Sequence, residues 1–158
     1  MILPLIILPI RNPQSAIPNP QSPIPPILMQ ILGVGTDIIE VLRIAQMIER
    51  HGELFINRVY TEHEVAYCGT RKAATQHYAG RWAAKEAVLK ALGTGWRQGI
   101  GWRDIEVRNE PGGAPKVALR GGTRDLIEQL GICEMQISIS HCRTYATALA
   151  IAVGAGEK

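Results

Sequence analysis

The residues best suited to chemistry lie in the stretch 81–95, RWAAKEAVLKALGTG. This stretch is rich in Ala, Leu, Lys and Glu and has no Gly or Pro until its end, which predicts the last turns of a long helix. On such a helix Glu86 and Lys90 lie one turn apart on one row, and Arg81 and Lys85 form the neighbouring row. We therefore expect one carboxylate among three cations.

A second carboxylate, Asp37, stands near the end of a predicted strand at residues 31–39. Side chains alternate along a strand, so Gly33 and Gly35 share the face of Asp37. Two interpretations stay open. In the first, the face with Gly33 and Gly35 is bare because glycine has no side chain, and a ligand can approach the backbone there. In the second, the glycines admit a packed helix and Asp37 caps a turn. The helical Glu–Lys pair also suits an ordinary surface ion pair.

The chemistry available to these residues is phosphoryl transfer. Two carboxylates are too few for a calcium cage but suit Mg²⁺, which keeps several waters and also takes phosphate oxygens. The cations around Glu86 could bind the anionic groups of a phosphate ester. Such a reaction needs positioning and charge stabilisation more than covalent work by the protein. Neither glycine pair, Gly33 with Gly35 or Gly93 with Gly95, completes a nucleotide-binding fingerprint.

Length and composition favour one domain in a reducing compartment. A chain of 158 residues is long enough for one core. A net charge of +3 favours acidic partners, but a single Phe and the lack of a basic run with aromatics argue against nucleic acid. Three cysteines without C-x-x-C spacing favour the cytoplasm, and the four histidines show no zinc-type spacing with them.

Residues 1–28 differ in composition from the rest of the chain. They hold eight of the ten prolines, a single charge at Arg11, and a tandem heptapeptide at residues 12–18 and 19–25. Such a segment predicts extended, disordered chain, and its apolar start is too short to span a bilayer. We expect Met29 to be the functional start, so truncation to Met29 should leave activity intact.

The remaining pattern predicts an α+β fold with the order β-α-α-α-β-β-α-β-β. Hairpins dominate it, so mainly antiparallel sheet should pack on the long helix. The predicted strands cover residues 31–39, 102–108, 115–119, 135–141 and 145–153. The predicted helices cover residues 40–50, ended by Gly52; 61–68, opened by a Thr61–Glu64 capping box; about 74–92; and 123–131, with Leu126, Ile127 and Leu130 inward.

Three segments in this order resemble the signatures of one family. Residues 33–40 (GVGTDIIE), 81–95 and 137–141 (ISISH) are similar to those of holo-[acyl-carrier-protein] synthase, the small single-domain class of 4'-phosphopantetheinyl transferases. Residues 58–64 (RVYTEHE) are similar to a further family segment, and the resemblance covers about residues 29–154. It implies that family's fold and a role in fatty acid biosynthesis. The implied reaction moves the phosphopantetheine arm of coenzyme A to a serine of apo acyl carrier protein and releases adenosine 3',5'-bisphosphate.

The resemblance also implies roles for the two carboxylates and the second lysine. Asp37 and Glu86 would hold Mg²⁺ against the coenzyme A pyrophosphate. Glu86 would in addition accept the serine proton. Lys90 would neutralise pyrophosphate charge.

Further implied contacts involve the substrates and a second subunit. Arg81 and Lys85 would help to hold coenzyme A phosphates, and Arg43 would contact the acidic carrier protein. Members of this class are homotrimers with sites between subunits, so His141 would reach coenzyme A in a neighbouring subunit; a structural role for it stays open. Cys142 stands where the family usually has Thr, so one hydrogen bond of the family is not expected.

Two hypotheses that assign the chain to other functional classes remain. One is a non-catalytic module that recognises an acidic protein or a nucleotide, which should be indifferent to loss of Asp37 or Glu86. The other is a cysteine-dependent transferase that uses Cys142 near His141, although no third orienting group is evident.

Overall fold

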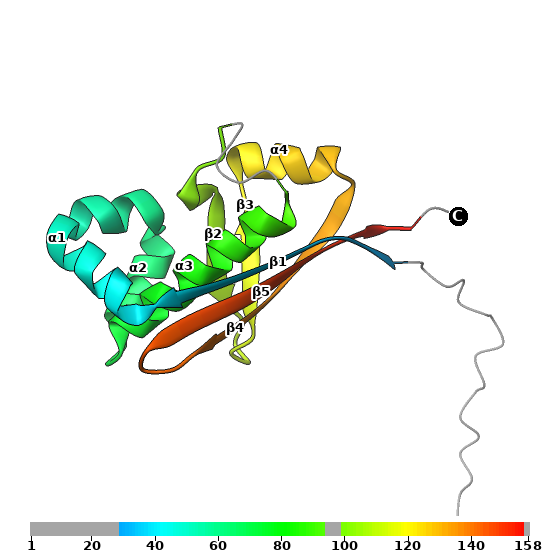
Figure 1. Cartoon of the computed structure of the whole chain (residues 1–158). Coiled ribbons are helices and arrows are strands. Elements are labelled where there is room, and N and C mark those ends of the chain that lie inside the picture. The colour runs from blue at the N-terminus through cyan, green and yellow to red at the C-terminus, as the bar shows by residue number, and fades with distance from the viewer. Residues whose placement is uncertain (1–28, 94–98, 157–158) are drawn as a thin grey trace, which may run out of the picture.

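The computed structural model describes residues 29–93 and 99–156 (Figure 1). The elements are β1 (Met29–Glu40), α1 (Val41–Val59), α2 (Glu62–Gly69), α3 (Ala74–Ala91), the 3₁₀ helix η1 (Trp102–Asp104), β2 (Ile105–Asn109), β3 (Pro115–Leu119), α4 (Gly121–Gln129), β4 (Ile132–His141) and β5 (Tyr145–Ala155). All strand pairs are antiparallel, so the predicted α+β order is confirmed. The expectations for residues 1–28 lie outside the described residues.

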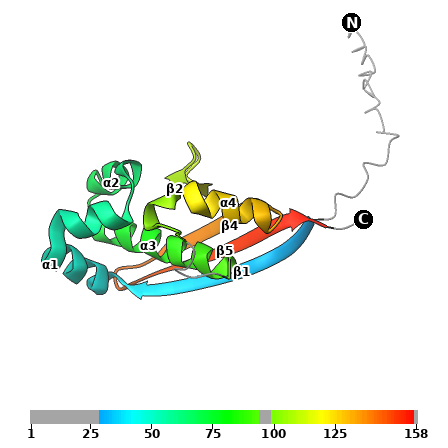
Figure 2. The same cartoon turned by 90° about the horizontal axis from the view of Figure 1, so that it is seen from above.

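One sheet carries the long helix α3. Its strand order is β1-β5-β4, and β2 pairs with β3 in a separate two-stranded sheet. Figure 2 shows α3 lying along the three long strands. None of the described helices is long and apolar enough to cross a membrane.

Small residues let α3 lie close to this sheet. Gly33 and Gly35 of β1 pair with alanines of β5, and α3 contributes fully buried alanines. A Cβ atom on Gly35 would lie 2.0 Å from the carbonyl oxygen of Ala87, and one on Gly33 would lie 2.0 Å from that of Ala91. The glycines therefore admit a packed helix, as in the second interpretation of the bare face.

Three predicted boundaries were wrong. Gly52 does break the helical backbone, with φ 54° and ψ −134°, but α1 resumes to Val59 because Phe55 and Val59 are buried in the core. Residues 102–104 form a 3₁₀ turn instead of a strand, where Gly101 N donates to the Asp104 carboxylate at 2.9 Å. Leu130 is 44% exposed because α4 ends before it, at Gln129.

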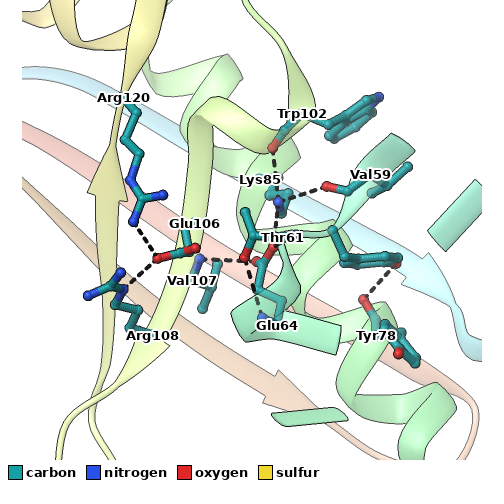
Figure 3. A network of polar contacts seen from close by, with 11 residues as sticks. Val59, Thr61, Glu64, Tyr78, Lys85, Trp102, Glu106, Val107, Arg108 and Arg120 are labelled. Carbon is teal, nitrogen blue, oxygen red and sulfur yellow. Dashed lines mark hydrogen bonds and ion pairs between the residues drawn. The ribbon is translucent and has the colours of Figure 1, made fainter. Parts of the chain in front are cut away.

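A buried carboxylate joins α2 to the second sheet. The predicted capping box is present: Thr61 N donates to Glu64 Oε2 at 2.8 Å, and Glu64 N donates to Thr61 Oγ1 at 3.3 Å. Glu64 is fully buried, and its Oε1 also accepts from Val107 N of β2 at 3.0 Å. The local cap therefore also makes a long-range tertiary contact (Figure 3).

Lys85 of α3 completes this buried network. Its Nζ lies 2.8 Å from Glu64 Oε2, and neither side chain is exposed. It also donates to the carbonyl oxygens of Val59 and Trp102, each at 2.9 Å (Figure 3). One ammonium group thus ties α3 to α2, to the end of α1 and to η1.

Candidate active site

Asp37 and Lys90 meet where the edge strand β1 runs beside α3. Lys90 Nζ lies 2.8 Å from Asp37 Oδ1 and donates to Thr36 O at 2.8 Å. Thr147 Oγ1 of β5 donates to the backbone oxygen of Asp37 at 2.8 Å, which fixes the strand there. These residues and Ile38 line a cavity of about 530 Å³. The structure thus brings together two of the residues singled out in the sequence.

Glu86 lies one helical turn before Lys90 on the same row of α3 and is partly buried. Asp37 and Glu86 offer carboxylate oxygens, the ligands that Mg²⁺ prefers. Within residues 29–93 and 99–156 no group of three or more His, Cys, Asp or Glu could hold a metal. An ion held by Asp37 and Glu86 would therefore complete its shell with water and substrate oxygens, which suits Mg²⁺. The Lys90 side chain is 51% exposed, so it has room to move off Asp37.

Arg81 and His141 line a second, smaller cavity of about 200 Å³. Arg81 is only 4% exposed; its Nη2 donates to Asn109 Oδ1 at 2.9 Å, and its guanidinium lies 4.0 Å from the ring centre of Tyr67. The Nε of Arg81 is buried and has no hydrogen-bond partner in the described part of the chain. An unsatisfied buried donor is costly, so a ligand oxygen at this position would stabilise it.

His77 belongs to the same cavity, although nothing in the sequence had singled it out. Its ring centre lies 5.2 Å from that of His141 in an edge-to-face arrangement. Burial lowers the pKa of His77, and the nearby positive groups of His141, Arg81 and Arg71 lower it further. The signal available in the sequence was its position four residues before Arg81, one turn away on the same helix.

The two clusters lie on opposite sides of α3. Arg81 and Lys90 are nine residues apart, which is two and a half helical turns. Asp37 lies on the edge strand β1 and His141 on the other edge strand, β4. Within residues 29–93 and 99–156, no residue lines both cavities. One copy of the chain therefore does not bring all the singled-out residues into one site.

Lys85 lies in neither cluster. Its ammonium is fully buried with Glu64 and two carbonyl oxygens, and burial lowers its pKa although the Glu64 carboxylate acts in the opposite direction. The sequence placed Lys85 on the row beside that of Glu86, and the structure buries its ammonium beneath neighbouring elements. A helical row gives the direction of a side chain but not what covers it.

Arg43 is exposed on the first turn of α1, next to the Asp37 cavity. It lines a further cavity of about 390 Å³, whose wall includes Ile38, and Ile38 also lines the cavity of Asp37. Cys142 lies in the turn between β4 and β5, where its Sγ accepts from Tyr145 N at 3.4 Å. Its sulfur thus has a structural contact in this turn.

Comparison with known proteins identifies the class. The sequence model of the 4'-phosphopantetheinyl transferase superfamily matches residues 33–150. The chain belongs to this superfamily, because the match covers more than half of its length.

The relatives narrow the class to one kind of enzyme. The chain is 50% identical over 121 residues to a holo-[acyl-carrier-protein] synthase of Protochlamydia amoebophila, covering 76% of this chain and 96% of the relative. It is 49% identical over 122 residues to that of Gloeobacter violaceus, covering 77% and 92%. The prediction of an enzyme of the holo-[acyl-carrier-protein] synthase class is thereby confirmed.

Solved structures agree with this assignment and with the fold. The holo-ACP synthase of Plasmodium yoelii superimposes with a TM-score of 0.71 at 32% identity, covering 82% of this chain and 99% of that one. The synthase of Helicobacter pylori, solved in complex with coenzyme A, gives a TM-score of 0.67 at 28% identity, covering 75% and 98%.

Proposed function

We propose that this chain transfers 4'-phosphopantetheine from coenzyme A to a serine of apo acyl carrier protein in a Mg²⁺-dependent reaction. The products would be holo acyl carrier protein, for fatty acid biosynthesis, and adenosine 3',5'-bisphosphate. The observation that carries the proposal is the ion pair of Asp37 and Lys90, with Nζ and Oδ1 2.8 Å apart. Glu86 lies one turn before Lys90 on α3. These are the positions at which the resemblance implies metal and pyrophosphate contacts.

The reaction exchanges one phosphorus–oxygen bond for another. The serine oxygen forms a bond to the phosphorus that carries pantetheine, and the bond from that phosphorus to the oxygen of the adenosine bisphosphate breaks. Glu86 would accept the serine proton. Lys90, half exposed, would turn from Asp37 to the pyrophosphate and stabilise the charge on the leaving group. Mg²⁺ held by Asp37 and Glu86 would supply further charge stabilisation and orientation.

The Arg81 cavity suits the other anionic group of coenzyme A, its 3'-phosphate. Arg81 is a buried cation whose Nε has no hydrogen-bond partner among the described residues. His141 of β4 lines the same cavity. Guanidinium groups match phosphate oxygens in geometry and charge. Lys85 has no part in this assignment, since it is fully buried elsewhere.

A homotrimer would unite the two clusters. Because they lie on opposite sides of α3, a cyclic assembly can bring the Arg81 cavity of one copy to the Asp37 cluster of the next. The sheet face turned away from α3 also exposes apolar side chains, namely Leu32 (41%), Val34 (56%), Ile38 (67%) and Leu149 (36%). A contiguous exposed apolar patch is typical of an interface. Light scattering should give the mass of three chains, and an active monomer would refute the assembly.

The carrier protein would dock on the first turn of α1. Arg43 is exposed there beside Leu42, which is 63% exposed, and the cavity of Arg43 adjoins that of Asp37 through Ile38. An acidic carrier helix would meet the cation and place its serine near the metal residues. We also place the enzyme in the cytoplasm, in keeping with three cysteines that form no disulfide.

Intact-mass spectrometry of apo acyl carrier protein tests the proposal. With this protein, coenzyme A and Mg²⁺, the carrier should gain one phosphopantetheine unit. A chelator should abolish the gain, and Asp37→Asn should do so while the protein keeps its fold by circular dichroism. A folded wild-type protein that binds coenzyme A but leaves several carriers unmodified would instead indicate a non-catalytic binding module.

A further inference from the structure

Among the residues that the structure describes, the Arg81 cavity is lined by two histidines and by no acidic residue. The polar and aromatic side chains of this lining are Tyr67, His77, Arg81, Asn109 and His141. His77 comes from the first turn of α3 and His141 from the end of β4, so the two imidazoles reach the cavity from different elements. The cavity therefore gathers groups that can carry positive charge and lacks a negative group to balance them.

The surroundings of His77 oppose its protonation while the cavity holds no anion. The charged and titratable groups that face it are His141 of β4, Arg81 of α3, Arg71 of the α2–α3 connection, and Tyr67 of α2, whose ring centre is 5.7 Å away. Burial and the first three of these groups lower the pKa of His77. Positive neighbours and partial burial disfavour the imidazolium, so His77 is mainly neutral near pH 7.

A phosphate monoester would reverse this balance. It brings nearly two negative charges at pH 7, and an opposite charge within a few ångströms favours the charged form of a histidine. Arg81 lines the cavity, and its buried Nε has no hydrogen-bond partner among the residues that the structure describes, so an acceptor oxygen of a ligand could satisfy it. An anion on Arg81 would lie one helical turn from His77.

From this geometry we propose that His77 is a further binding residue for the 3'-phosphate of coenzyme A and takes up a proton when that phosphate binds. The identity of the ligand rests on the proposed function; the proton uptake rests on the cavity. Binding should therefore tighten as the pH falls toward 6.5. One extra proton in the complex corresponds to up to about tenfold in affinity per pH unit.

Isothermal titration calorimetry on the full chain measures this uptake directly. Coenzyme A is titrated at pH 7.0 in two buffers with different ionisation enthalpies, and the difference in heat gives the protons taken up. His77→Gln removes the titrating group, and His77→Phe keeps an aromatic ring against Tyr67 and His141. His63→Gln is the matched control, because His63 is exposed on α2 and does not line the cavity.

We expect wild type and His63→Gln to take up the same number of protons and to bind more tightly at pH 6.5 than at pH 8.0. Both His77 variants should lose most of that uptake and show a flatter pH dependence. The second ionisation of the phosphate itself, near pH 6, is common to all proteins and cancels in the comparison. With 3'-dephospho-coenzyme A, wild type and the His77 variants should behave alike.

Three outcomes would overturn the inference, each in a different way. Equal proton uptake in wild type and the folded His77 variants would refute the role of His77 and leave the proposed function standing. A His77-dependent uptake that persists with dephospho-coenzyme A would refute the assignment to the 3'-phosphate. Wild-type protein that binds no coenzyme A would contradict both this inference and the proposed function.

Discussion

Replacement of Lys85 by Met should be among the most destabilising single changes in this domain. Lys85 is fully buried, and the change would leave the Glu64 carboxylate buried without its cation, although Thr61 N and Val107 N would still donate to it. Removing one partner of a buried pair costs roughly 3–5 kcal/mol. Because a typical domain is stable by about 5–15 kcal/mol, this loss would be a large fraction of the total.

Urea unfolding followed by circular dichroism, at one fixed protein concentration, would measure this loss. Changing both Glu64 and Lys85 to Met should restore part of the stability, since it removes the uncompensated charge. Lys116→Met is the matched control: it breaks an ion pair with Glu110 at 2.9 Å between exposed side chains and should leave the midpoint nearly unchanged. If Lys85→Met unfolds at the same urea concentration as this control, the network does not hold α3 in place.

Three further predictions concern packing, ionisation and docking. Gly35→Ala should be strongly destabilising, because its Cβ would lie 2.0 Å from a carbonyl oxygen of α3, whereas Gly69→Ala has open space and should leave the melting temperature nearly unchanged. Burial raises the pKa of Cys68 to about 11, so the unfolded chain loses the thiol proton first and stability falls between pH 9 and 11. A shift of two pKa units corresponds to about 3 kcal/mol in the free energy of unfolding. In urea unfolding, Cys68→Ala should therefore remove most of the fall in this free energy between pH 9 and 11, and the exposed control Cys133→Ala should leave that fall unchanged. Arg43→Glu should raise the KM for acyl carrier protein and leave that for coenzyme A unchanged, and salt should weaken carrier binding by wild type more than by the variant; equal salt dependence would contradict the docking site.

Features set by local hydrogen bonds and backbone geometry could be predicted from the sequence. The Thr61–Glu64 capping box and the left-handed Gly93 after α3, with φ 71°, both depend on neighbours within a few residues. The pairing of Asp37 with α3 needed a second clue, which the family resemblance supplied. Arg81 and Lys90 are nine positions apart in the sequence, which places them on opposite sides of a helix, so their separation could also have been predicted.

Features set by tertiary packing could not be predicted in this way. Lys85 is buried because Glu64, Val59 and Trp102, at distances of 17 to 26 residues along the chain, converge on it. The helix α1 resumes after Gly52 because Phe55 packs in the core, and no local signal competes with that burial. His77 lies in the cavity beside His141 only because β4, more than fifty residues later in the chain, packs near α3.

The most direct test of this account is subunit complementation. Its central claim is that the Asp37 cluster of one copy and the Arg81 cavity of the next form one site. Asp37→Asn disables the Asp37 cluster. His141→Glu places a negative charge at the Arg81 cavity, and His141 is exposed, so the fold should tolerate this change. Each variant alone should transfer little phosphopantetheine at limiting coenzyme A.

Co-expressed with different tags and purified as mixed trimers, the two variants should recover activity. In every mixed trimer one of the three shared sites has both halves intact, so we expect about one third of the wild-type rate. Mixed trimers that stay as inactive as the separate variants would show that both halves of the site act within one copy, and would contradict the account.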